Sequence, residues 1–222
     1  MIDLEAYLGK QIPTSATYWE NGIEILTIPE NLTDVSFLDI GGGASDITAN
    51  LLLRGANAFS IDPAYKSRSD LKGRILGQLK PENYTKENIA RIRQGLETFM
   101  QSIKTNPNRY RAEFATHTSF QDNFFDYIYS INLVTAYLDI DLDTLNRAVD
   151  ESIRISKPGA TIQYFPFLEP EPSGSLVINT QRIKNDQSLL DRLSKDTRIK
   201  DFSVREIEFW GRKTLTLIKS DY

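Results

Sequence analysis

Cysteine is absent from the 222 residues of this chain, and histidine occurs only once, as His117. Without cysteine the chain has no disulfide, no thiolate metal site and no cysteine nucleophile. The single histidine also excludes a site that is built from several histidines, and we predict no metal site. Two large classes of catalytic and metal-binding proteins are therefore excluded.

Long apolar runs are also missing. No stretch has the length that a membrane span needs, and the amino-terminal MIDLEAYLGK lacks the basic-then-apolar pattern of a signal peptide. We therefore expect a cytoplasmic protein that does not contact a membrane. With 40% hydrophobic residues, the chain suits one globular domain with a sizeable core and a small appended cap.

Charge is distributed unevenly along the chain. The formal net charge of −4 argues against general adhesion to nucleic acid. Residues 64–111, however, contain eleven basic and four acidic side chains, a local charge of 11 − 4 = +7. We expect a basic helical insertion there. The basic side chains either form its solvated face or attract an anionic substrate, such as a phosphorylated metabolite, a carboxylate or RNA.

The first predicted elements form a βαβ unit. Residues 35–40 (VSFLDI) are typical of a buried strand, and residues 44–54 have the apolar spacing of a helix that ends at Gly55. Residues 58–61 (AFSI) are a second short strand. We therefore expect the two strands to be parallel, with a right-handed crossover.

The rest of the chain continues this alternation. We expect helices at residues 67–78, 85–104, 143–156 and 184–194, and strands at residues 112–116, 127–131, 160–167, 202–210 and 214–219. The last two strands form an antiparallel hairpin. The predicted fold is α/β: a Rossmann-like, doubly wound, mostly parallel sheet with a C-terminal antiparallel hairpin. We expect a cap at residues 1–34 and one domain at residues 35–222.

The glycine loop DIGGGASD, residues 39–46, follows the first predicted strand. In open α/β sheets ligands bind at the carboxyl ends of the strands, and glycine lets a ligand approach the backbone. Asp62 ends the second strand, 62 − 43 = 19 residues after Gly43. A carboxylate in that position can accept both hydroxyl protons of a ribose.

The loop departs from the dinucleotide fingerprint at one position. Gly41 and Gly43 fit the G-x-G-x-x-G pattern, but Asp46 stands where the third glycine belongs. An acid at a helix amino terminus would repel a pyrophosphate, but it would not repel a ligand with a positive centre and no phosphate. The loop therefore favours a nucleoside with a cationic or zwitterionic tail over NAD.

With these motifs the sequence resembles the class I S-adenosylmethionine-dependent methyltransferases. Their first motif is matched by Asp39, Gly41, Gly43 and Ser45, and their second acid by Asp62. Residues 118–130 (TSFQDNFFDYIYS) are similar to their fourth-strand motif, and residues 154–160 (RISKPGA) to their turn into strand five. The resemblance implies the seven-stranded methyltransferase fold, S-adenosylmethionine as cofactor and S-adenosylhomocysteine as product.

The resemblance also implies roles for single residues. Gly41 and Gly43 would approach the methionine portion and the ribose, and Asp62 would bind the ribose hydroxyls. Asp39 would lie behind the loop or face the amino group of the cofactor. The remaining expected contacts are Ser45 in the loop, Pro63 and Ala64 beside the adenine, His117 or Thr116 at its edge, and Ser130 and Asn132 facing the methyl donor and the substrate. His117 and Asn132 are the candidate catalytic residues.

Two alternatives to a methyltransferase remain at this point. The first is a protein that binds S-adenosylmethionine without catalysis, as a sensor or a partner subunit. The second is an NAD-dependent oxidoreductase, which Asp46 and the terminal hairpin disfavour. The acceptor is open: we expect a small-molecule or anionic substrate, with RNA less favoured.

Overall fold

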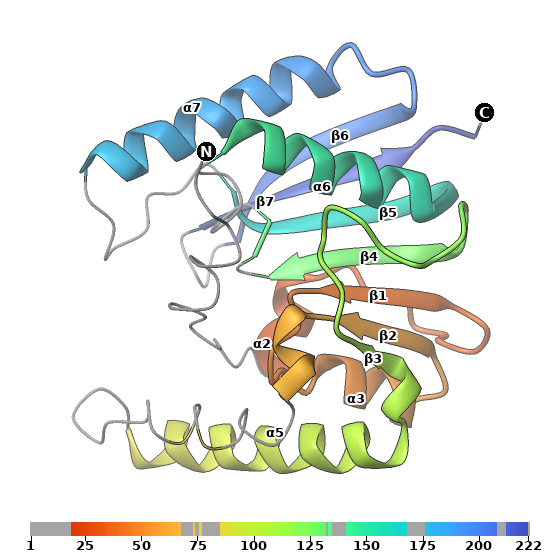
Figure 1. Cartoon of the computed structure of the whole chain (residues 1–222), viewed down its shortest axis with the longest axis vertical. Coiled ribbons are helices and arrows are strands. Elements are labelled where there is room, and N and C mark those ends of the chain that lie inside the picture. Colours follow the sequence, from red (N-terminus) through yellow and green to blue (C-terminus); the bar gives the residue numbers. More distant parts are fainter. Residues whose placement is uncertain are drawn as a thin grey trace.

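The computed structural model describes residues 19–67, 73, 76, 85–131, 133–134, 141–167, 176–207 and 212–221. A single seven-stranded sheet has the order β3-β2-β1-β4-β5-β7-β6 (Figure 1). The strands are β1 (Ser36–Ile40), β2 (Asn57–Ile61), β3 (Tyr110–Arg111), β4 (Phe125–Ile131), β5 (Ser156–Phe167), β6 (Ile199–Ile207) and β7 (Arg212–Lys219). The helical elements of the described part are α2 (Trp19–Ile25), α3 (Ile47–Leu53), α5 (Lys86–Thr105), α6 (Leu142–Ile155) and α7 (Leu176–Leu193), with the 3₁₀ turns η1 (Pro63–Ser67) and η3 (Pro107–Arg109).

The order of the strands reverses between β1 and β4. From β1 the chain moves outwards to β2 and β3, all parallel, and then returns to β4 on the other side of β1. Strand β5 continues the parallel set, whereas β7 pairs antiparallel with both β5 and β6. The predicted mostly parallel sheet with a terminal antiparallel hairpin is confirmed, and β7 lies inside the sheet between β5 and β6.

Most elements predicted from the sequence are confirmed, among them the parallel β1–α3–β2 unit. The strand expected at residues 112–116 is wrong in position: β3 is Tyr110–Arg111, and Phe114 and His117 form only an isolated bridge. The reason is that Tyr110, 1% exposed, buries its ring among the aromatic residues of α5 and η1. The helix expected at residues 67–78 lies largely outside the described residues, as do residues 1–18 of the expected cap.

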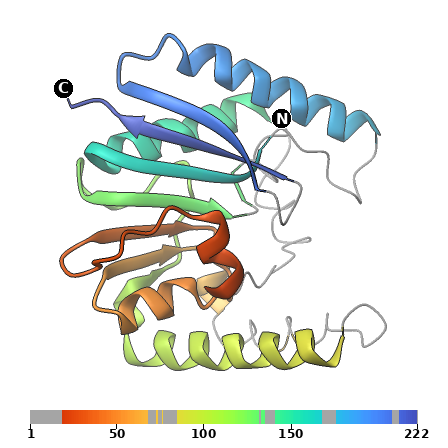
Figure 2. The ribbon, with the colours of Figure 1, turned by 180° about the vertical axis from the view of Figure 1, so that it is seen from behind.

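Helices cover both faces of the sheet. Helices α6 and α7 lie on the face seen in Figure 1, and α2 and α3 lie on the face seen in Figure 2. Successive strand residues point to opposite faces, so Leu38 belongs to the same buried cluster as Leu145 of α6, while Phe37 belongs to another cluster with Ile25 of α2 and Ile47 of α3. The two buried layers hold β1 in the middle of the molecule.

Helix α5 joins β2 to β3 and forms the edge of the molecule beside them (Figure 1). Thr85 caps it by accepting the N–H of Asn88 at 3.1 Å, as the sequence pattern indicates. Its apolar stripe packs on Tyr65 of η1, on Tyr110 of β3 and on Ala44 of the glycine loop. The described part of the basic segment therefore supplies the crossover of a parallel strand pair, while the domain limits expected from the sequence remain a prediction.

Aromatic and basic side chains cover the sheet between β3 and β4. Residues 112–124, all of them described, form no helix. Phe59, Phe120 and Phe125 instead pack edge to face, with ring centroids 4.7–5.9 Å apart. The guanidinium carbon of Arg109 lies 4.3 Å from the Phe59 centroid, and that of Arg111 lies 4.1 Å from the Phe120 centroid. Between β3 and β4 the chain has no helix, and these cation–π contacts cover the aromatic rings there instead.

The described residues contain neither a candidate membrane-spanning helix nor a candidate metal cluster. None of their helices combines the length and the apolar composition that a membrane span requires. The same residues hold no group of three or more histidines or carboxylates that could bind a metal ion.

Candidate functional site

The part of the glycine loop between β1 and α3, residues 41–46, leaves the carboxyl end of β1 and leads into α3, at the point where the strand order reverses. Gly41 (φ 76°) and Gly43 (φ 51°) have left-handed conformations, which glycine adopts without strain. The N–H of Gly41 donates to the carbonyl of Ile61 at 2.8 Å and ties the loop to β2. Ligands of open α/β sheets bind at such reversal points.

The first two glycines are needed because the loop lies directly on other residues. A Cβ at Gly42 would lie 2.1 Å from Oγ of Ser60 and 2.6 Å from Oδ2 of Asp39. A Cβ at Gly41 would lie 2.5 Å from side-chain atoms of Leu133, at the end of β4. Only glycine fits at these close approaches, so the loop is a thin layer over the polar side chains of β1 and β2.

Gly43 and Asp62 together form the centre of the candidate site. The N–H of Gly43 donates to Oδ2 of Asp62 at 3.0 Å, and the N–H of Ala64 donates to Oδ1 at 2.8 Å. A Cβ at Gly43 would meet, among the described residues, only Oδ2 of Asp62, at 3.9 Å. A carboxylate has roughly four acceptor positions. The two amide bonds therefore leave room for two further donors beside an open stretch of backbone.

Burial affects both carboxyl groups near the loop. Asp62 is 7% exposed, and its burial raises its pKa, while the hydrogen bonds from Ala64 and Gly43 lower it in part. Asp39 is 3% exposed and lies behind the loop, where Oγ1 of Thr48 donates to its Oδ2 at 3.4 Å. Burial and the charge of Asp62 raise the pKa of Asp39 to about 8. Both effects favour the protonated form of Asp39.

Ser45, Ser130 and Pro63 occupy the surroundings of the loop. Oγ of Ser45 accepts the N–H of Ile47 at 3.2 Å and so shapes the entry into α3. Ser130 is 1% exposed, and its Oγ accepts the N–H of Val134 at 3.1 Å, which fixes the turn after β4. Pro63 is half-buried at the start of η1, directly after Asp62. Cofactor contacts of these three residues remain predictions.

The two candidate catalytic residues stay unassigned. His117 is exposed, and its N–H donates to the carbonyl of Phe114 at 3.2 Å in a tight turn. Asn132 lies outside the described residues. Their roles toward an acceptor, and that of His117 or Thr116 toward an adenine, remain predictions.

The ion pair between Glu151 and Arg154 on α6 fixes the chain that follows the Phe114–His117 turn. The sequence alone does not predict this contact. Oε1 of Glu151 accepts both the N–H (2.7 Å) and the hydroxyl (2.6 Å) of Thr118. Arg154 donates to both carboxylate oxygens of Glu151, at 2.8 and 2.7 Å, and to the carbonyl of Phe120. Burial alone would raise the pKa of Glu151, but the bonds from Arg154 and Thr118 hold it at about 2. The i, i+3 spacing of Glu151 and Arg154 is visible in the sequence. The bond from Thr118 to Glu151 is not, because these residues lie 33 positions apart.

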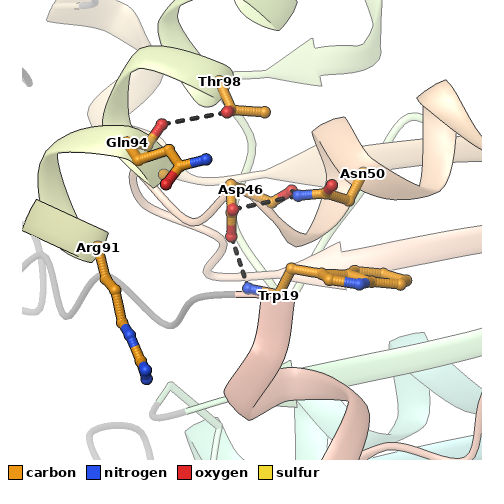
Figure 3. A pocket seen from close by; sticks show the side chains of 7 residues that line it. Trp19, Asp46, Asn50, Arg91, Gln94 and Thr98 are labelled. Atoms are coloured by element: carbon orange, nitrogen blue, oxygen red, sulfur yellow. Dashed lines mark hydrogen bonds between the residues drawn. The ribbon is translucent and has the colours of Figure 1, made fainter. Parts of the chain in front are cut away.

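From the sequence, the charge of Asp46 is expected to disfavour a pyrophosphate. The structure shows that its carboxylate also binds the start of helix α2. Its Oδ1 accepts the N–H of Trp19 at 2.7 Å, and its Oδ2 accepts a bond from Asn50 at 3.1 Å (Figure 3). A pocket of about 160 Å³ opens beside it, lined by Trp19, Asp46, Asn50, Arg91, Gln94, Gly95 and Thr98. None of the cofactor or catalytic residues predicted from the sequence lines this pocket, which lies on the α3–α5 side of the loop.

Several solved methyltransferases are similar in structure to this chain. Phosphoethanolamine N-methyltransferase 2 of Haemonchus contortus, in complex with phosphomonomethylethanolamine and S-adenosylhomocysteine, matches with a TM-score of 0.54. The two sequences are 14% identical, and the match covers 91% of this chain and 53% of that chain. The likeness shows that this chain has the fold of S-adenosylmethionine-dependent methyltransferases.

Further similar structures come from microorganisms. An S-adenosylmethionine-dependent methyltransferase of Methanosarcina mazei is 18% identical, over 88% of this chain and 95% of that chain, with a TM-score of 0.49. N-methyltransferase NodS of Bradyrhizobium japonicum is 12% identical, over 86% and 80% of the two chains, with a TM-score of 0.46. No protein-family model and no curated protein matches the sequence.

Proposed function

We propose that this protein is an S-adenosylmethionine-dependent methyltransferase. The observation that carries the proposal is the bond from Gly43 to Asp62 at the reversal point of a β3-β2-β1-β4-β5-β7-β6 sheet. Sheets that bind dinucleotides have the parallel order 3-2-1-4-5-6. The antiparallel β7 between β5 and β6 departs from that order and counts against an NAD-dependent oxidoreductase.

The residues at the loop fit the cofactor. Asp62 has acceptor capacity for two hydroxyl donors, as many as a ribose offers, and Gly43 has no side chain to keep the ligand from the backbone. We propose that Gly41 and Gly43 lie along the methionine portion and the ribose, with Pro63 beside the adenine. A protonated Asp39 beneath Gly42 keeps the floor of this site free of a second full negative charge.

Binding and alignment are the tasks of the protein in this proposal. When bound, S-adenosylmethionine supplies a methyl group that its sulfonium already activates. The chain must then hold the acceptor in line with that methyl group and exclude water. A base is useful for hydroxyl acceptors and optional for amines, and we propose His117 and Asn132 as the first residues to test. The absence of cysteine excludes methylation of a pyrimidine C5 through a cysteine adduct.

For the acceptor we propose a small anionic molecule. The Haemonchus structure is a complex with phosphomonomethylethanolamine, a phosphorylated small molecule, and S-adenosylhomocysteine. In this chain the segment that directly follows Asp62 has a charge of 11 − 4 = +7 over residues 64–111. A positive segment there would raise the local concentration of an anionic substrate.

A methyl-transfer assay tests this function. The protein is incubated with S-adenosylmethionine and, in separate reactions, with phosphorylated amines, carboxylates and RNA, and S-adenosylhomocysteine is measured. We expect product with at least one small anionic acceptor and none with RNA. Binding of S-adenosylmethionine without turnover on any acceptor would instead support a binding protein without catalysis.

A further inference from the structure

Asp46 stands at the start of α3, where a carboxylate ordinarily caps its own helix. Its side chain makes no capping bond to α3, and its backbone dihedral angles are φ −91° and ψ 4°. Its Oδ1 accepts the N–H of Trp19, the first residue of α2, at 2.7 Å (Figure 3). The first N–H groups of a helix have no partner within that helix. Asp46 thus caps a helix that lies 27 residues earlier in the chain.

The carboxylate of Asp46 is held in this orientation. The amide of Asn50 donates to its Oδ2 at 3.1 Å and to its backbone carbonyl at 2.9 Å. Asp46 is only 8% exposed. Because Asn50 holds this buried acceptor in place, the bond to Trp19 is a firm link between α2 and α3.

Helix α2 packs mainly against the start of α3. A Cβ at Gly22 would lie 2.7 Å from Cδ1 of Ile47, the first residue of α3. Ile25, 1% exposed, is part of the same buried cluster as Ile47. At the far end of α3, the guanidinium carbon of Arg54 lies 4.7 Å from the centroid of the Trp19 ring. The position of α2 is therefore set by the same helix into which the glycine loop leads.

We propose that Asp46 is a positioning residue that couples the docking of α2 to the conformation of the glycine loop, and thereby raises the affinity for S-adenosylmethionine. This inference rests on the proposed function. Asp62 holds the loop at Gly43, and Asp46 holds it where it enters α3. A ligand that orders the loop strengthens the docking of α2, and by thermodynamic linkage the docked α2 strengthens binding of the ligand.

Two variants of Asp46 distinguish a role of its hydrogen bond from a role of its charge. Asp46→Asn and Asp46→Ala both remove the charge, but only Asp46→Asn keeps an oxygen that can accept the N–H of Trp19. If the hydrogen bond is what matters, Asp46→Asn resembles the wild type and Asp46→Ala does not. Glu24→Ala, which removes an exposed carboxylate from α2, is the matched control for charge.

Isothermal titration calorimetry with S-adenosylmethionine and S-adenosylhomocysteine measures the effect on affinity. We expect Asp46→Ala to weaken both ligands by about tenfold, Asp46→Asn by less than about threefold, and Glu24→Ala not at all. With an acceptor, Asp46→Ala should raise KM for S-adenosylmethionine and leave kcat unchanged. Equal weakening by Asp46→Asn and Asp46→Ala, or wild-type affinity of Asp46→Ala, would overturn the proposal.

Hydrogen exchange of the amides in Trp19–Ile25 measures the coupling itself. S-adenosylhomocysteine should slow this exchange in the wild type and in Asp46→Asn, and it should have little effect on it in Asp46→Ala. Equal protection of α2 by the ligand in all three proteins would show that no coupling passes through Asp46. If no adenosyl compound binds, the proposed function fails. Exchange in the ligand-free proteins then tests whether Asp46 holds α2. Faster exchange of α2 in Asp46→Ala than in Asp46→Asn supports this role, and equal exchange overturns it.

A second pair of variants tests the same bond from the donor side. Proline is accepted at the first position of a helix but lacks the N–H. Trp19→Ala removes the ring and keeps the donor, whereas Trp19→Pro removes both. We expect Trp19→Pro to bind S-adenosylhomocysteine about fivefold more weakly than Trp19→Ala. Equal affinities would contradict the proposal even if Asp46→Ala failed to fold.

Discussion

The backbone N–H of Gly43 donates a hydrogen bond of 3.0 Å to Oδ2 of Asp62, so the glycine loop and the acid that ends β2 form one unit. Two residues that lie 19 positions apart thereby meet at the carboxyl edge of neighbouring parallel strands. A Cβ at Gly43 would lie 3.9 Å from the same Oδ2, so the bare backbone of Gly43 lies beside this carboxylate.

Replacing Asp62 should therefore abolish cofactor binding. Asp62→Ala removes the acceptor for Gly43 and the carboxylate that we propose for the ribose hydroxyls, so we expect no thermal stabilisation by S-adenosylhomocysteine. Glu30→Ala, at an exposed carboxylate, is the control and should bind like the wild type. Retained binding in a folded Asp62→Ala variant would show that the ribose contact lies elsewhere.

Two glycine variants separate close packing from backbone strain. Gly42→Ala places a methyl group 2.1 Å from Oγ of Ser60, so the loop must move, and we expect binding to be lost. Gly55 has φ 87° and no described neighbour within 4 Å of its Cβ position. Gly55→Ala should cost only about 1–2 kcal/mol of stability from strain and leave binding intact. Calorimetry of both variants checks this, and equal losses of binding would refute the packing argument.

Asp39 makes a prediction about pH. Its pKa is raised from 3.8 to about 8, so the folded state keeps a proton that the unfolded state releases. The protonated Asp39 contributes its whole stabilisation below the pKa of the unfolded state. This contribution is lost as the pH rises toward about 8. Asp39→Asn lacks the titration. Relative to the wild type, the variant should therefore gain stability on the order of 5 kcal/mol across that interval, because one pKa unit corresponds to about 1.4 kcal/mol.

Urea unfolding of Asp39→Asn and the wild type over a series of pH values measures this difference. The two free energies of unfolding should diverge between about pH 4 and pH 8 and then run parallel. A difference that stays constant with pH would mean that Asp39 is ionised in the folded protein.

Glu151 makes the opposite prediction at acid pH. Its pKa is lowered from 4.5 to about 2, so its contribution is full above 4.5 and is lost as pH falls toward 2. Glu151→Gln should destabilise the protein by about 1–3 kcal/mol at neutral pH, and the loss should vanish in acid. Denaturant unfolding measures it, with Glu97→Gln at an exposed site of α5 as the control. A loss independent of pH would exclude an ionic role.

Much of the fold followed from local patterns in the sequence. Helix α5 was predicted almost to the residue because Thr85 caps it and its apolar spacing is regular. The placement of β3 failed because its two residues are chosen by the packing of Tyr110 on α5, which no pattern within residues 110–116 reveals. Short edge strands depend on tertiary contacts more than on propensity.

The candidate site could be predicted from the sequence where its residues belong to one βαβ unit. The loop glycines and Asp62 are recognised from spacing alone, and the structure brings them together. The sequence shows that Asp46 stands in the place of a third glycine. It does not predict the bond to Trp19, because that bond depends on how α2 docks. The link from Glu151 to Thr118 also joins residues that are distant in sequence, so only the folded structure shows it.

The most direct test of the central claim is a thermal shift experiment with S-adenosylmethionine, S-adenosylhomocysteine and NAD in parallel. A ligand at one hundred times its dissociation constant adds about 2.7 kcal/mol to stability. We predict a clear rise in Tm with both adenosyl compounds and none with NAD. No rise with either adenosyl compound, or a rise with NAD alone, would contradict the account.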